Sequence, residues 1–331
     1  MKPTLGILSA ECRLPTQTRS VPDVFAEEGL AWSEEHSARL GIDRVPVAAP
    51  GERGSRLALE AAQAALTAAG VAASNLDVIV DCTSLPQEYL VPAWSMSNKL
   101  QADLGAAKAF TIGFSGGGAT NFHTGLHFAA CLAASDARIR NVLLVAADIA
   151  IPNNRVLAGE DPVTVLGDAA SALVLGRGAT SDVVLDTELH SDGELHAVCY
   201  VPGGAMAHPE RRDLFRLELD AAVYRRAPRA QTLRRLAGQL LARHGLAMED
   251  IVLHIAPNIS RVERSELGAA LGVAADRFGP DNLATHGHLH ATDFVLNYRS
   301  AIERDSVRPG DHIMISSHGF GFVAGVSLLR H

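Results

Sequence analysis

The sequence predicts an α/β fold assembled from two copies of one strand–helix unit. Its 331 residues suffice for roughly two domains of about 150 residues each. Apolar, strand-like segments recur along the chain at offsets of 173, 170 and 167 positions. The landmarks that give these offsets are Asp77 with Asp250, Asn141 with Asp311, and Leu104-Gly105 with Leu271-Gly272. Three concordant offsets favour a duplicated unit over a chance likeness.

In each copy a helical pattern ends at a glycine and a buried strand follows. The first copy has an Ala-rich helix near residue 61, then Gly70, then a strand at 75–80. The second has a helix near residue 233, then Gly245, then a strand at 249–253. Because these strands are continuously apolar, we expect helices to cover them on both faces. We divide the chain into an N-terminal half, 1–175, and a C-terminal half, 176–331.

Composition limits the possible functions. Apolar residues make up 47% and charged residues 20%, which is typical of a compact globular protein. The net charge of −8 argues against a nucleic-acid binder, and no apolar run reaches the roughly 18 residues that a membrane span needs. Residues 1–8 are too short and interrupted for a signal peptide. The four cysteines form no C-x-x-C pair, which favours reduced, buried thiols in a cytoplasmic protein: Cys12, Cys82, Cys131 and Cys199.

The segment 113–118, Gly-Phe-Ser-Gly-Gly-Gly, is the first candidate site. An apolar run at 109–112 precedes it and a helical pattern at 121–134 follows it, so we expect a strand, a tight turn and a helix. Glycine permits a strained turn, and free N–H groups at a helix N-terminus can stabilise an oxyanion. This pattern predicts that Ser115 is a nucleophile. A structural turn with a capping serine is the alternative.

The segment 285–293 is the second candidate site, because it contains three histidines and an aspartate. Serine needs a general base, and an acid beside the base fixes its tautomer. Ser115, His288 and Asp293 supply these three types. The 173-residue offset relates Ser115 to His288, so packing of the two halves would place them in one cleft. At least one of His286 and His290 is expected to be structural only.

Two rival interpretations remain open at this point. His288-x-His290 approaches a metal-binding pattern, but Thr292 is an extra residue and Phe294 stands where the last histidine belongs. Residues 113–117 satisfy the G-x-S-x-G motif of α/β-hydrolases, but their order is serine, acid, histidine, and here it is serine, histidine, acid. We therefore expect no metal and no organic cofactor.

With these residues, the chain resembles the ketoacyl-ACP synthase III branch of the thiolase-fold enzymes from about Gly41 to His331. The motifs that carry the likeness are Gly41-Ile42-Asp43-Arg44, Ala48-Ala49-Pro50-Gly51-Glu52, Leu76-Asp77-Val78-Ile79-Val80, Leu166-Gly167-Asp168-Ala169-Ala170 and Gly319-Phe320-Gly321-Phe322. The resemblance implies a thiolase-like fold, with a duplicated α/β unit in five α-β-α-β-α layers. It also implies a homodimer.

Three departures from the family bear on the reaction. The family's nucleophilic cysteine aligns with Ser115, its catalytic asparagine with His288, and its catalytic histidine with Ile255. Since the family's histidine and asparagine stabilise an enolate together, the resemblance does not support decarboxylative condensation here. Acyl transfer needs only a nucleophile, a base and an oxyanion hole. The chain thus resembles the acyltransferase-type members of antibiotic pathways.

The resemblance also implies the donor and the supporting residues. Glu35 and Glu160 replace a tryptophan and an arginine that bind coenzyme A in the family, whereas Arg39 is retained. An acyl-carrier-protein thioester is therefore the expected donor, and the candidate carrier-binding residues are Arg39, Arg261 and Arg264. The N–H groups of Ser115 and Phe320 would form the oxyanion hole. His196 and His290 are candidate accessory donors.

The predicted function is acyl transfer in polyketide or other antibiotic biosynthesis. The acyl group would pass from the carrier thioester through acyl-Ser115 to a carrier-protein thiol or a small-molecule acceptor. One alternative is a starter-unit condensing enzyme of the synthase III type, and another is a non-catalytic paralogue.

Overall fold

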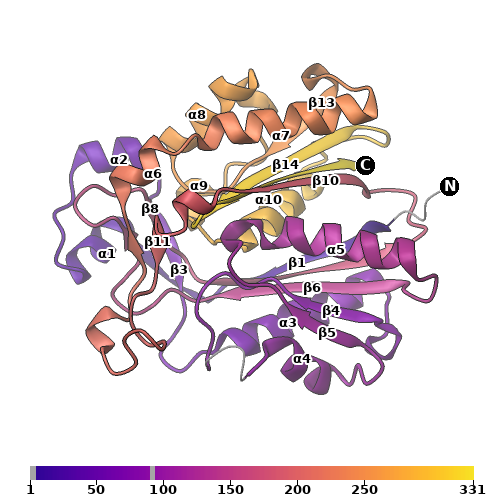
Figure 1. The fold of residues 1–331 in the computed structure, drawn as a ribbon, viewed down its shortest axis with the longest axis horizontal. Coiled ribbons are helices and arrows are strands. Elements are labelled where there is room, and N and C mark those ends of the chain that lie inside the picture. Colours follow the sequence, from indigo (N-terminus) through magenta and orange to yellow (C-terminus); the bar gives the residue numbers. More distant parts are fainter. Residues whose placement is uncertain (1–4, 90–93) are drawn as a thin grey trace.

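A computed structural model describes residues 5–89 and 94–331 (Figure 1). Nine strands form one continuous sheet in the order β13-β14-β15-β10-β1-β9-β6-β4-β5. Their bounds are β1 Leu5–Arg13, β4 Val78–Asp81, β5 Phe110–Gly113, β6 Asn141–Asp148, β9 Ala169–Arg177, β10 Val183–Ser191, β13 Ile251–Ile255, β14 His312–Gly319 and β15 Val323–Arg330. Three two-stranded sheets are β2 Gln17–Ser20 with β3 Arg44–Val47, β7 Val156–Leu157 with β8 Thr164–Val165, and β11 Cys199–Tyr200 with β12 Glu218–Leu219.

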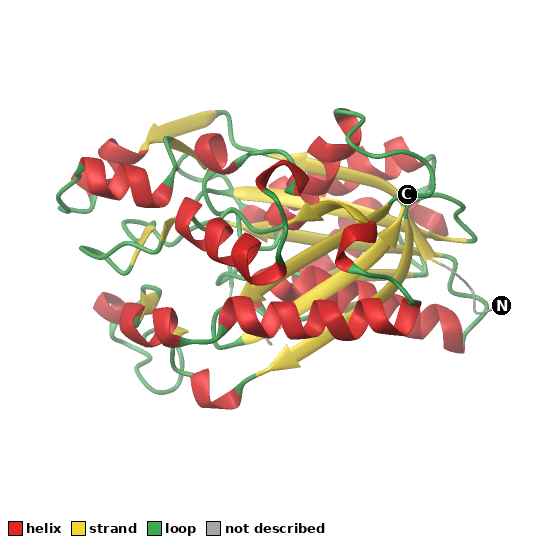
Figure 2. Ribbon diagram, turned by 90° about the horizontal axis from the view of Figure 1, so that it is seen from above, coloured by secondary structure: helices red, strands yellow, loops and turns green. Residues whose placement is uncertain are grey.

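The helices lie in three layers around this sheet. Figure 1 shows α3 and α4 on one outer side, α7 and α8 on the other, and α5 and α10 between the two halves of the sheet; Figure 2 gives the view turned by 90°. The α-helices are α1 Val21–Glu27, α2 Glu34–Leu40, α3 Gly54–Ala69, α4 Met96–Leu104, α5 Asn121–Ser135, α6 Ala221–Arg226, α7 Arg229–His244, α8 Arg261–Leu271, α9 Leu283–His286 and α10 Thr292–Glu303. The short 3₁₀ helices are η1 Ala73–Asn75, η2 Gly118–Thr120, η3 Gly193–Leu195, η4 Arg212–Leu214, η5 Met248–Asp250 and η6 Ala275–Arg277. This arrangement is the predicted thiolase-like, five-layered α/β fold.

The two halves repeat one topology, as the sequence offsets predict. β4 pairs in parallel with β6, which pairs antiparallel with β9; β13 pairs in parallel with β14, which pairs antiparallel with β15. The helices before β4 and β13, α3 and α7, each have 16 residues and end at a glycine in the left-handed region, Gly70 and Gly245. The division at residue 175 stays a prediction; β9 ends at Arg177 and β10 begins at Val183.

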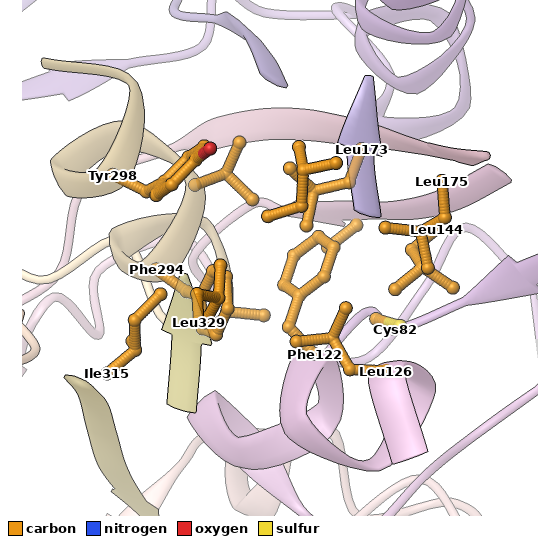
Figure 3. Packing of buried hydrophobic residues seen from close by; sticks show 14 of the residues in the cluster. Cys82, Phe122, Leu126, Leu144, Leu173, Leu175, Phe294, Tyr298, Ile315 and Leu329 are labelled. Atoms are coloured by element: carbon orange, nitrogen blue, oxygen red, sulfur yellow. The ribbon is translucent and has the colours of Figure 1, made fainter. Parts of the chain in front are cut away.

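The central core joins the two halves (Figure 3). Phe122 of α5 and Phe294 of α10 stack with their ring centroids 5.7 Å apart. Around them pack buried residues from strands of both halves, including Leu144, Leu173 and Ile315. Because α5 and α10 each contact strands of both halves, their apolar faces are buried only when the two halves are together.

Two further findings bear on the sequence predictions. Cys12, Cys82 and Cys199 are buried as expected, but Cys131 is exposed, which corrects the prediction for that residue. Cys131 lies one turn after His127 on the outer face of α5, with Sγ and Nε2 3.7 Å apart, so helix periodicity directs it away from the core. Across the described part of the chain, no helix has the length and apolarity to cross a bilayer.

A buried ion pair fixes the segment that runs beside the second candidate site. Both carboxylate oxygens of Asp168 accept from Arg155, at 2.7 and 2.8 Å, and also from the N–H groups of Ala48 and Ala150. The adjacent Gly167 N–H donates to the carbonyl of His288 at 3.0 Å. The family-like segment around Asp168 therefore aligns the backbone of His288.

We expect Arg155→Met to lower the free energy of unfolding by about 3–5 kcal/mol, because it leaves the fully buried Asp168 carboxylate without its cation. Urea denaturation followed by circular dichroism measures this loss. Arg56→Met is the control, since the Arg56–Glu60 pair is exposed and should contribute about 1 kcal/mol or less. Equal losses in the two variants would show that the buried pair has no special role.

Candidate active site

His288 and Asp293 form a buried, hydrogen-bonded pair. Nδ1 of His288 donates to Oδ2 of Asp293 at 2.6 Å, and each side chain is 1% exposed. Asp293 lies in the first turn of α10. Since Nδ1 carries the proton shared with the carboxylate, Nε2 is the nitrogen free to accept one. The structure thus brings together two of the three predicted site residues.

Asn258 completes the environment of Asp293, and the sequence analysis did not select it. Its backbone N–H donates to Oδ2 of Asp293 at 2.8 Å, and its Nδ2 donates to Oδ1 at 3.1 Å. The Leu289 N–H gives Oδ1 a second donor at 3.0 Å. Asn258 is the last residue of the Ile-Ala-Pro-Asn segment, which aligns with the family's His-Gln-Ala-Asn. This alignment is the feature of the sequence that could have identified Asn258 as a site residue.

Ser115 lies on the wall of a cavity of about 500 Å³, which Phe114, His290 and Phe320 also line. Its side chain is exposed, and it lies in the loop between β5 and η2. The predicted strand, tight turn and helix are present, with Ser115 in the turn and α5 beginning at Asn121 as predicted. Ser115 precedes the helix N-terminus, because Gly116 and Gly118, with φ of 88° and 52°, reverse the chain between them. Within the described residues, no hydrogen bond links Ser115 to His288.

The turn after β14 meets the glycine-rich loop. A Cβ on Gly319 would overlap the carbonyl oxygen of Gly117, so only glycine permits this approach. The backbone N of Phe320 lies 3.3 Å from where a Cβ of Gly118 would stand. The backbone nitrogen of Phe320 therefore lies beside the loop that carries Ser115. The N–H groups of Ser115 and Phe320 have no hydrogen-bond partner among the described residues.

The structure separates the two candidate accessory histidines. His290 is 2% exposed, lines the cavity, and its ring centroid lies 4.7 Å from that of His288. Burial and the neighbouring His288 lower the pKa of His290 well below its usual value, so it is neutral. It also holds a left-handed conformation, φ 52°, which is uncommon for a residue with a side chain. His196 is exposed and does not line the cavity.

Ile255, at the position aligned with the family's histidine, is a buried core residue and is not among the residues that line the cavity. It is 1% exposed at the end of β13 and packs in the central core with residues such as Leu289. The neighbouring His254 does not replace the missing histidine, because successive strand residues face opposite ways. Its ring contacts Phe278 and Nε2 bonds the Ser316 hydroxyl at 3.0 Å.

The three predicted carrier-binding arginines have different surroundings. Arg39 pairs with Asp161 at 3.1 Å, and Arg225 of α6 pairs with the same carboxylate. Arg261 donates to the carbonyl of Ala38, which places it beside the helix that carries Arg39. We call Arg39, Arg225 and Arg261 the basic corner. Arg264 is already engaged, since it pairs with Asp281 and donates to the Gly279 carbonyl.

Two buried aspartates near the cavity were not selected as candidate site residues from the sequence. Asp81, 5% exposed, accepts from the Thr83 N–H at 2.9 Å and from the Gln87 side-chain amide at 2.6 Å. Asp148, fully buried, accepts from the N–H groups of Ser84 and Leu85 through Oδ1, and its Oδ2 has no partner. Burial raises the pKa of Asp81, and burial raises that of Asp148 to about 7.

The overall structure defines the class of protein. Solved structures that share the thiolase-like fold include 3-oxoacyl-ACP synthase III from Aquifex aeolicus, with a TM-score of 0.82 at 21% identity and coverage of 99% of this chain and 100% of that one. An acyltransferase named ChlB3 has a TM-score of 0.82 at 23% identity, with coverage of 99% and 98%. At these identities the likeness establishes the fold alone.

The sequence comparisons establish the family. The family model for 3-oxoacyl-[acyl-carrier-protein] synthase III matches residues 117–193. The model for the C-terminal part of the same synthase matches residues 241–331. β-Ketoacyl-[acyl-carrier-protein] synthase III of Rhodobacter capsulatus is 31% identical over 303 residues, which cover 88% of this chain and 89% of that protein. The enzyme of a Ruegeria species is 32% identical over 322 residues, covering 94% and 95%. The chain belongs to the 3-oxoacyl-[acyl-carrier-protein] synthase III family, a family of acyltransferases.

We expect Asp148→Asn to gain stability relative to the unmodified protein as pH rises from about 4 to about 7. Because the folded state raises the pKa of Asp148, the unfolded chain releases this proton first, and the free energy of unfolding falls over that window. Asparagine keeps an oxygen for the Ser84 and Leu85 N–H groups and cannot ionise. Urea denaturation at pH 5 and pH 8 measures the difference. A variant that loses stability equally at both pH values would contradict this account.

Proposed function

We propose that this protein is an acyltransferase that moves an acyl group from an acyl-carrier-protein thioester, through an ester on Ser115, to an acceptor thiol or hydroxyl. The observation that carries the proposal is the His288–Asp293 pair, which has the form of a base with its orienting acid. Ile255 contributes no polar group at the position where the family has a histidine. Acyl transfer needs a general base, for which His288 is the candidate, and it needs no second donor to stabilise an enolate.

In the first step, Oγ of Ser115 attacks the thioester carbonyl and its proton passes to Nε2 of His288. The C–S bond breaks, and the departing carrier thiol takes the proton from His288. In the second step, the acceptor O–H or S–H gives its proton to Nε2 and its oxygen or sulfur attacks the ester. The bond to Ser115 breaks, and Oγ recovers the proton.

This sequence requires Ser115 to approach His288 when substrate is bound. Gly116, next to Ser115, has open space around its Cβ position, which favours such a movement, whereas Gly117 and Gly118 lie against Gly319. The N–H groups of Ser115 and Phe320 are the proposed oxyanion donors, and both are free to donate.

Condensation of a starter unit is the second candidate function. The curated relatives favour it, because those compared above are named β-ketoacyl-[acyl-carrier-protein] synthase III. In this chain, however, the positions of the family's two enolate donors hold His288 and the apolar Ile255. A non-catalytic paralogue is the third possibility, and it would form no acyl-enzyme.

The basic corner is the proposed docking site for the acidic carrier protein. We also propose a homodimer, because β5 is an edge strand of the sheet and its Phe110 is 58% exposed. The unpaired cysteines suit a cytoplasmic enzyme of polyketide or other antibiotic biosynthesis.

Acylation of Ser115 is tested by intact-protein mass after incubation with an acyl-carrier donor. Ser115→Ala should gain no acyl mass, and His288→Ala should acylate about a thousandfold more slowly or worse, because serine depends on its base. Ser95→Ala, which removes another hydroxyl that lines the cavity, should acylate normally. Peptide mapping that places the acyl group on the exposed Cys131 would overturn the assignment.

Transfer and condensation are separated by offering matched acyl-carrier and acyl-coenzyme A donors, with malonyl-carrier as partner. We expect acylation from the carrier donor at the higher rate and no release of carbon dioxide, because a missing enolate donor typically costs about a hundredfold or more in rate. Product mass and gas release are measured together. A ketoacyl product with carbon dioxide would support the condensing function.

A further inference from the structure

In the part of the chain that the structure describes, the charge on the wall of the cavity beside Ser115 is acidic and not basic. Of the described residues that line it, none is lysine or arginine, and Asp81 is the one carboxylate. Asp81 is almost fully buried, and the residues that donate hydrogen bonds to it, Thr83 and Gln87, are both neutral. A buried carboxylate without a cation is costly, and a bound cation would relieve that cost.

The same cavity carries polar atoms that have no partner. Oγ of Ser84, Oε1 of Gln87 and Nε2 of His290 are buried without any hydrogen bond, and all three residues line the cavity. The remaining Gln87 group is an acceptor, because its amide nitrogen already donates to Asp81. A neutral histidine and a hydroxyl can accept as well. Buried polar atoms are normally satisfied, so this set indicates a ligand rich in donors.

An ammonium group matches these features. It has three N–H donors and a positive charge, which suit one carboxylate surrounded by neutral acceptors. Phe114 and Tyr200 line the same cavity, and aromatic rings can also attract a cation. A volume of about 500 Å³ falls in the range of small-molecule sites. A carboxylate-bearing ligand, by contrast, would meet Asp81 and no positive charge.

We propose that the cavity binds a small molecule that carries a protonated primary amine, with Asp81 as its counter-charge and Gln87, Ser84 and His290 as its hydrogen-bond acceptors. That this molecule is the acyl acceptor rests on the proposed function. The ammonium serves for recognition and keeps its proton, and a separate hydroxyl or thiol of the same molecule receives the acyl group by the second step described above.

The test compares three probes of matched size on the full-length, unacylated protein: 2-phenylethylamine, 2-phenylethanol and 3-phenylpropanoate. Calorimetric titration should show that the amine binds about tenfold or more tightly than the alcohol, since hydrogen bonds to charged groups are the strong ones. The carboxylate should bind most weakly. The proposal is overturned, before any variant is made, if the amine shows no saturable binding. It is also overturned if the carboxylate binds as tightly as the amine.

Variants then locate the binding. Asp81→Asn should reduce the preference for amine over alcohol to about threefold or less and leave alcohol binding unchanged, and Gln87→Leu should weaken amine binding. Asp103→Asn, which removes an exposed carboxylate on α4, is the matched control and should keep the full preference. A preference that survives in Asp81→Asn and Gln87→Leu overturns the proposal. Because these titrations need no catalysis, they stay informative if Ser115 is never acylated.

Discussion

The site depends on one buried carboxylate. Asp293 accepts hydrogen bonds from the His288 ring, from the backbone and side chain of Asn258, and from the Leu289 N–H. These donors come from the loop after β13 and from the loop before α10. A carboxylate buried in this way is stable only when its lone pairs are filled, so the two loops and the imidazole are held in one arrangement. The orientation of His288 therefore follows from the satisfaction of Asp293.

A second constraint acts on the opposite side of the site. Gly319 lies against Gly117 and Gly118 so closely that a side chain at Gly319 has no space. This contact fixes where the turn after β14 meets the loop before α5, and it brings Phe320 to the cavity. The His288–Asp293 pair and the loop that carries Ser115 are therefore held by separate sets of contacts.

Sequence reasoning succeeded where the signal was periodic or close in the chain. The duplicated unit, the start of α5 at Asn121 and the contact of His288 with Asp293 all follow from spacing or offset. It failed where side chains meet through the fold. Asp81 and Asp148 are ordinary aspartates until β4 and β6 bury them, and Asn258 is one polar residue in a loop. The strand–turn–helix setting of Ser115 also follows from the sequence pattern, but its distance from the helix N-terminus does not, because a run of glycines fixes no single backbone path.

The place of β1 in the sheet has a consequence for the synthesis of the protein. β1 begins at Leu5, yet its two neighbours, β9 and β10, begin at Ala169 and Val183. After it leaves the ribosome, β1 must therefore wait until the chain as far as β9 and β10 has been made. At typical elongation rates this is on the order of ten seconds, during which Leu5 and Ile7 have no sheet to cover them. A chaperone that binds short apolar segments near the ribosomal exit would protect this strand until its partners arrive.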